Sequence, residues 1–168
     1  MVDEQTIERC KNGDVQAFHV VYQTYEKPLL GMSMRMLGQQ ADAEDAVQQC
    51  FLQLYRGIHK FRNDAKFSTY LYRIQMNVCL DLLRKKKHIQ VVEIEETELL
   101  TQDPDVVLQL HLKRAIDQLP EQQKACFVLF AVKDMKQEDI AEILGISQGT
   151  VKANIHHAKN RLRKLLKE

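Results

Sequence analysis

Six basic side chains lie near the end of the chain, in a segment with the periodicity of one helix. They are Lys152, Lys159, Arg161, Arg163, Lys164 and Lys167. Lysine and arginine bind phosphate oxygens, and a helix that enters a DNA groove brings its first side chains to the base edges. This segment therefore predicts non-covalent DNA binding. The alternative that fits the same residues is a basic helix face exposed only to water.

The residues in front of this helix favour DNA binding. A short helix over 137–144 precedes Gly145, whose type suits a turn with positive φ, and Ser147 is a good cap for the following helix. Val151 and Ile155 lie four apart and should pack inward, which is the spacing of a helix-turn-helix. The outward face should then hold Gln148, Gly149, Lys152, Ala153, Asn154 and His156.

Charge is unevenly distributed along the 168 residues, although the formal net charge is only +1. Residues 1–90 carry a net +3, residues 91–105 a net −6, and residues 106–168 a net +4. The hydrophobic content of 45% is sufficient for packed cores. No basic leader or bilayer-length apolar run occurs, and the four cysteines are widely spaced, so we expect a soluble cytoplasmic protein with reduced thiols.

Apolar residues recur every three or four positions on both sides of the acidic stretch. The predicted fold class is all-α, with two small helical bundles joined by a flexible acidic linker. The expected boundaries are 1–90 for the N-terminal domain, 91–104 for the linker and 105–168 for the C-terminal helix-turn-helix domain. In the first domain we expect Asp14 to cap a helix that Pro28 bends or breaks and that Gly38 ends. We expect Asp42 to open the next helix and Ser68 to cap a fourth.

The remaining motifs resemble those of a known family. The segments "DAEDAVQQCFLQLYRGIHKF" (42–61) and "KFSTYLYRIQMNVCLDLLRKKK" (66–87) resemble the signature of bacterial RNA polymerase sigma factors of the extracytoplasmic-function group. The segment from 119 to 166 resembles the promoter-binding domain of that group, so the resemblance covers nearly the whole chain. It implies a factor that binds core RNA polymerase and directs promoter recognition.

The resemblance also implies where the partners bind. The helix over 42–59 should dock on the clamp helices of the largest polymerase subunit through Asp45, Gln48, Gln49 and Leu52, while Val47, Phe51, Leu54, Tyr55 and Ile58 face the core. The stretch that follows should recognise and open the minus ten element, with the loop 62–66 as the pocket for an unstacked base. The expected contacts are Phe61, Arg62, Asn63, Asp64, Lys66, Phe67, Tyr70, Arg73, Asn77, Arg84 and Lys85. Core packing is the alternative for Phe61, Phe67 and Tyr72.

The C-terminal domain should recognise the minus thirty-five element. The expected contacts are Ser147, Gln148, Gly149, Thr150, Lys152, Ala153, Asn154 and His157. Asn154 and His157 stand where the family commonly has arginine, which forms bidentate contacts to guanine or phosphate, so the usual promoter preference is not expected to carry over. Tyr70 stands at a common tryptophan position, and Gln75 at a position where a small residue is common.

We therefore expect a sigma factor that is not an enzyme and needs neither a cofactor nor a metal. Its expected partners are core RNA polymerase, promoter DNA and an anti-sigma factor, without direct membrane contact. Two alternatives remain at this point. One is a free-standing helix-turn-helix regulator that binds an operator as a dimer, and the other is a degenerate sigma-like regulator of polymerase.

Overall fold

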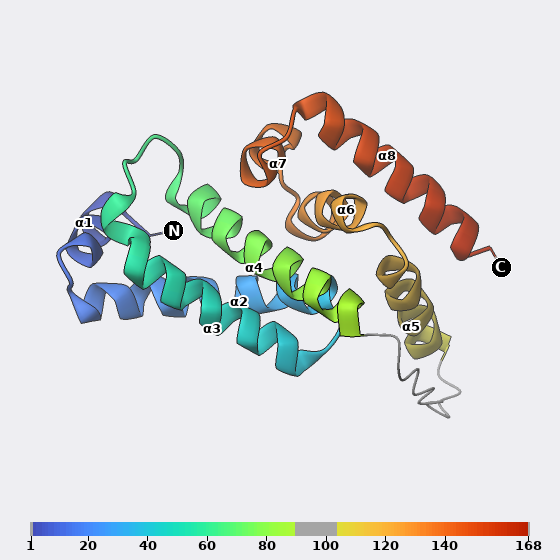
Figure 1. Ribbon diagram of the computed structural model, residues 1–168, viewed down its shortest axis with the longest axis horizontal. Helices are drawn as coiled ribbons and strands as arrows, with labels where there is room; N and C mark the ends of the chain where they lie inside the picture. Colours follow the sequence, from blue (N-terminus) through green and yellow to red (C-terminus); the bar gives the residue numbers. More distant parts are fainter. Residues whose placement is uncertain (1, 90–103, 168) are drawn as a thin grey trace. The chain divides into compact units, whose positions relative to one another are not determined.

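The computed structural model describes residues 2–89 and 104–167, and within these ranges it consists of helices without a strand. Figure 1 shows their order along the chain. The elements are α1 (Glu4–Lys11), α2 (Val15–Leu37), α3 (Gln40–Gly57), the 3-10 turn η1 (Ile58–Lys60), α4 (Phe67–Ile89), α5 (Pro104–Asp117), α6 (Glu121–Lys133), α7 (Gln137–Leu144) and α8 (Gln148–Leu165). The all-α prediction is confirmed.

The chain divides into two compact units, Met1–Cys79 and Leu80–Glu168, and each is described by itself. This division falls inside α4, whereas the sequence placed the first domain boundary at residue 90. The expected linker lies almost wholly outside the described residues. The proposed domain limits therefore stay predictions.

Several helix ends in the first unit are set by the expected residues. The Asp14 carboxylate accepts hydrogen bonds from the backbone N–H groups of Gln16 (2.9 Å) and Ala17 (3.2 Å), which are otherwise unpaired at a helix start. Gly38 ends α2 with a φ of 79°, a conformation that glycine adopts without a steric penalty. Both predictions are confirmed.

Two local predictions are wrong, and of the two alternatives given for Pro28 the break is excluded. Pro28 does not break α2, which runs from Val15 to Leu37 and buries Leu29 and Met32 immediately after the proline. Packing of this face offsets the one backbone hydrogen bond that proline removes. The third helix begins at Gln40 rather than at Asp42, which lies in its first turn, and α4 begins at Phe67, so Ser68 lies inside it.

An aromatic cluster lies at the two ends of the loop between η1 and α4. Phe61 lies against Phe67 with ring centroids 5.7 Å apart, and Phe67 lies against Tyr25 of α2 at 6.0 Å. Deeper in this unit, Gln75 of α4 donates a hydrogen bond to the Ser33 hydroxyl of α2 at 2.5 Å, both side chains being fully buried. These contacts fix α4 on α2.

The second unit packs α5 and α6 against α8. Ala115, Leu119, Ala158 and Leu162 form its buried cluster, in which the two alanines let α5 and α8 approach closely. The buried Lys124 ammonium of α6 lies 2.7 Å from the Asp117 carboxylate of α5. These contacts hold α8, whose opposite side is exposed.

Candidate polymerase and promoter interfaces

The α3 face expected to bind polymerase is exposed. Asp45, Gln48, Gln49 and Leu52 are exposed, and 54% of Leu52 remains accessible. Their spacing of three or four residues places them on one side of the helix, opposite the buried Val47. This face combines polar groups with one apolar side chain, which is a composition suited to a partner helix.

Tyr55 was expected in the core, and this prediction is wrong. Its side chain is 57% exposed, and its ring meets Phe18 of α2 edge-on, with centroids 5.3 Å apart. Phe18 lies against the buried Phe51 as well, at 6.4 Å. Phe18 and Phe51 leave the Tyr55 ring at the surface next to Leu52.

The loop between η1 and α4 separates two pockets. The pocket on the α4 side has a volume of about 190 Å³ and is lined by Lys60, Phe61, Arg62, Asp64, Ala65, Tyr70 and Arg73. The pocket on the α1 side has a volume of about 200 Å³ and is lined by Val2, Glu4, Ile7, Tyr25, Phe61, Asn63, Ala65, Lys66, Phe67 and Ser68. The first has three basic side chains and one acidic side chain, whereas the second has a largely apolar floor.

Phe61 and Phe67 are not the exposed aromatic surface that the sequence suggested. Each is only 7% exposed, which agrees with the core-packing alternative. Tyr70 covers Phe61 in a stacked arrangement at 4.9 Å and is itself half-buried. The two phenylalanines thus form the floor of the loop, because burial in the core removes their apolar surface from water, which is favourable.

The polar residues expected at the minus ten element are accessible. Arg62, Asn63, Asp64 and Lys66 are exposed on the loop, and Arg73, Asn77, Arg84 and Lys85 are exposed along α4. Asn63 has a φ of 59°, a left-handed conformation that asparagine tolerates better than most residues. The Arg84 guanidinium lies 3.2 Å from the Asp81 carboxylate on the same helix.

The helix-turn-helix has the expected local geometry. Gly145 has a φ of 66°, and the N–H of Ile146 donates to the Ala141 carbonyl at 3.1 Å, which closes the turn. The Ser147 hydroxyl accepts from the Thr150 N–H at 3.1 Å and caps α8. Val151 and Ile155 are buried. These features leave an exposed surface at the start of α8 that comprises Gln148, Gly149, Thr150, Lys152 and Ala153.

Asn154 differs from this expectation, because it lies at the edge of the buried stripe. It precedes the buried Ile155, is half-buried, and its side chain hydrogen-bonds the Cys126 thiol of α6. Burial raises the pKa of Cys126 to about 11, and this hydrogen bond opposes the rise. The thiol therefore stays protonated at neutral pH, and Asn154 contributes to the α6–α8 contact.

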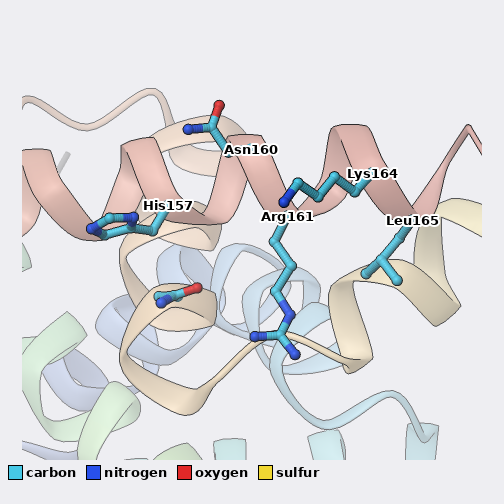
Figure 2. Close-up of a pocket in the computed structure, with 6 residues that line it drawn as sticks. His157, Asn160, Arg161, Lys164 and Leu165 are labelled. Carbon is cyan, nitrogen blue, oxygen red and sulfur yellow. The ribbon is translucent and has the colours of Figure 1, made fainter.

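A groove of about 570 Å³ lies between α8 and the start of α6 (Figure 2). Figure 2 shows Arg161 and Leu165 extending from one side of α8, while Asn160 points to the other. The groove residues are Gln123, His157, Asn160, Arg161, Lys164 and Leu165. His157 thus lines a basic groove beyond the first turns of α8. The spacing of three or four residues between His157, Arg161 and Lys164 is the feature of the sequence that places them on one side of α8.

Two further features of the described residues concern metal binding and membrane crossing. Among the described residues, no group of three histidine, cysteine or acidic side chains is arranged to hold a metal ion. His156 and His157 lie side by side with ring centroids 5.9 Å apart, and the His156 ring is within 2.9 Å of the Asn160 amide nitrogen. No helix in the described ranges is both long and apolar enough to cross a bilayer.

The helical unit that carries the 62–66 loop and the helix-turn-helix unit match the two domain models of one protein family. A model of Sigma-70 region 2 matches residues 21–89, and a model of Sigma-70 region 4 matches residues 109–162. The ECF RNA polymerase sigma factor SigW of Bacillus subtilis (strain 168) is 35% identical over 100% of this chain and 98% of its own length. SigM of Mycobacterium tuberculosis is 32% identical over 92% of this chain and 79% of its own. The chain belongs to the ECF family of RNA polymerase sigma factors.

Solved structures have the same fold. CnrH, solved in complex with the cytosolic domain of CnrY, matches with a TM-score of 0.78 and 23% identity, over 99% of this chain and 98% of that one. The sigma factor RpoE of Bartonella quintana, solved in complex with the anti-sigma factor NepR, matches with a TM-score of 0.70 and 23% identity, over 91% and 98%. The resemblance noted from the motifs is confirmed, and the protein is a transcription initiation factor.

Proposed function

We propose that this sigma factor binds the clamp helices of core RNA polymerase through α3, captures the minus ten element at the 62–66 loop and α4, and binds the minus thirty-five element through α8. The loop, with a pocket on each side, is the observation that carries this proposal. An unstacked base needs an apolar cavity, and its phosphates need nearby cations. The two pockets supply these separately.

The polymerase contact rests on exposure and composition. Asp45, Gln48, Gln49 and Leu52 form a face with no structural role in the core of the first unit. Polar contacts around a central apolar side chain give specificity and affinity together. The nearby Tyr55 extends the apolar part of this face.

The minus thirty-five contact divides into two parts. Gln148, Gly149, Thr150, Lys152 and Ala153 are exposed at the start of α8, where a helix in the major groove reaches base edges, and Ser147 caps that start. His157 lies farther along, next to Arg161 and Lys164, and fits a phosphate contact. Asn154 acts through the position of α8 rather than by direct base recognition.

The proposed role is not enzymatic, because the factor directs a polymerase that performs the chemistry. It works in the cytoplasm beside the polymerase, without a cofactor or metal of its own. An anti-sigma factor is its proposed inhibitor, in keeping with the RpoE–NepR complex of Bartonella quintana. Such an inhibitor would cover the exposed α3 face or the α8 face.

Transcription in vitro with purified core polymerase and a library of randomised promoters tests the function. We expect core polymerase to initiate at a defined promoter set only when the protein is present. A free-standing regulator would instead bind duplex DNA tightly without polymerase, and a degenerate regulator would bind polymerase without directing initiation. Either result would overturn the proposal.

Promoter opening has its own test at the loop. Alanine at position 63 would strain a backbone with a φ of 59°, so Asn63→Gly together with Asp64→Ala is the better variant. We expect it to reduce permanganate-reactive open complex on duplex promoters more than on templates already mismatched at the minus ten element. Equal losses on both templates would mean that the loop contributes to docking rather than to melting.

A further inference from the structure

The pocket on the α1 side of the loop has a wall that belongs to the N-terminal segment of the chain. Val2, Glu4 and Ile7 line it, opposite Asn63 and the aromatic floor. No sequence motif pointed to this segment. The inference that follows rests on the proposed capture of an unstacked base at this loop.

The pocket has the composition of a site for one ring system. Its floor is apolar, made by Ile7, Tyr25, Phe61 and Phe67, and its polar lining residues are Glu4, Asn63, Lys66 and Ser68. Its volume of about 200 Å³ is below the roughly 300–1,000 Å³ of pockets for drug-sized ligands. A single nucleobase in contact with this apolar floor is the ligand class that suits these features.

The position of Glu4 is well determined by the packing of α1. The Asp3 carboxylate caps α1 by accepting from the Thr6 N–H at 2.8 Å, and Ile7 and Cys10 are buried. At the other end of the helix, the Lys11 ammonium lies 5.5 Å from the centre of the Phe61 ring. Glu4 is therefore held at the rim of the pocket by a helix that is attached to its floor.

The chemistry of the rim predicts a base preference. An ionised carboxylate only accepts hydrogen bonds, and in the part of the chain that the structure describes, the Glu4 carboxylate has no ion pair or side-chain hydrogen bond. Cytosine and adenine carry an exocyclic amino donor, whereas thymine presents a carbonyl oxygen at the equivalent position. A carboxylate beside thymine O4 would place two acceptors together.

We propose that Glu4 determines base specificity in this pocket, by accepting a hydrogen bond from the amino group of a cytosine or adenine flipped out of the minus ten element. The basic pocket on the other side of the loop holds the adjoining phosphates through Arg62 and Arg73. The loop then separates base recognition from backbone binding.

The test uses holoenzyme assembled from core polymerase and the full chain. It selects bound molecules from a library of single-stranded DNA whose minus ten region is randomised, so that base preference is measured without melting. The variants are Glu4→Gln and Glu4→Lys, and Gln5→Ala is the matched control, since Gln5 is exposed on the same turn but lines neither pocket. Circular dichroism of each variant checks that α1 and the rest of the fold are retained.

We expect the parent holoenzyme to favour cytosine or adenine over thymine at one position, by about 5- to 150-fold for a good base contact. Glu4→Gln should keep part of this preference, because its amide oxygen still accepts. Glu4→Lys, which only donates, should shift the preference to thymine or guanine. Gln5→Ala should behave like the parent.

Two outcomes would overturn the inference, and they differ from failure of the proposed function. If the parent selects an amino-bearing base and Glu4→Lys selects the same base equally strongly, other residues determine the specificity. If all variants lose binding to every sequence alike, Glu4 contributes to folding or affinity only. If the parent holoenzyme enriches no sequence at any position, base capture at the loop itself is wrong.

Discussion

Two glycines near the start of α8 should respond in opposite directions to replacement by alanine. Gly145 has a φ of 66°, and a Cβ added there meets no described atom within 4 Å, so the cost of Gly145→Ala is the backbone conformation alone, about 1–2 kcal/mol. Gly149 lies in the first turn of α8, where an added Cβ meets only the Ser147 hydroxyl at 3.7 Å. Gly149→Ala should therefore stabilise α8 by up to about 1 kcal/mol.

The same two variants distinguish an effect on the stability of α8 from an effect on DNA binding. Amide hydrogen exchange in the full chain should show opening of α8 about 5 to 30 times more often in Gly145→Ala, and less often in Gly149→Ala. Gly149 lies on the surface proposed to face the minus thirty-five element, and a methyl group there would separate the helix from the bases. We expect Gly149→Ala to weaken holoenzyme binding to promoters that need this element, by about fivefold or more.

Competition between promoter fragments with and without the minus thirty-five element measures this effect. A more stable Gly149→Ala variant that binds both fragments as the parent does would mean that this backbone is not near DNA. Unchanged hydrogen exchange in Gly145→Ala would show that the positive φ does not penalise alanine at this turn.

Three further predictions follow from exposure, charge and burial. Asp45→Arg with Gln48→Ala should compete poorly for core polymerase while the thermal midpoint is unchanged, because both side chains are exposed; equal competition would place the docking face elsewhere. Arg163→Ala with Lys164→Ala should weaken binding to all promoters and reduce the slope of log affinity against log salt by about 2, measured by titration at several salt concentrations; loss on only some promoters would indicate base contacts. Burial, with a smaller contribution from neighbouring Cys79, raises the pKa of Cys50 to about 12. The protonated thiol should therefore contribute its full stabilisation below about pH 8.5, and this stabilisation should be lost as the pH rises toward 12. Urea unfolding across this pH range would detect the loss as a falling free energy of unfolding.

The features predicted correctly from sequence depend on neighbouring residues. Asp14 and Ser147 cap helices because a short side chain with an oxygen acceptor reaches N–H groups two or three residues ahead. Gly38 and Gly145 end helices because glycine adopts positive φ at little cost. Each of these causes acts within one turn, so the sequence contains all the necessary information.

The features that were missed depend on contacts between distant residues. Asn154 has the spacing of an outward residue, yet its amide hydrogen-bonds Cys126 on another helix. Tyr55 has the spacing of a core residue, yet Phe18 and Phe51 already fill that space. Periodicity predicts which side of a helix is buried but not which residues at the edge of that side find a partner.

The candidate base pocket shows the same limit more strongly. Its walls come from α1, α2, the loop and the start of α4, and only the loop and α4 carried a recognisable motif. Asn63 was expected at the site, whereas Glu4 enters it because α1 packs beside η1, and Tyr25 of α2 enters it because its ring lies against Phe67. A pocket made by four segments cannot be predicted from the pattern of any one of them.

In both units, the residues proposed for base recognition differ from those proposed for phosphate binding. In the first unit the loop separates an apolar pocket from a basic one, and in the second the start of α8 is separate from the basic groove at His157, Arg161 and Lys164. Phosphate contacts set the salt dependence of affinity, whereas base contacts set the preference among sequences. A changed base in either promoter element should thus alter affinity at every salt concentration by a similar factor. Removal of a groove cation should instead alter the salt slope itself, because the charge that releases counterions has been lost.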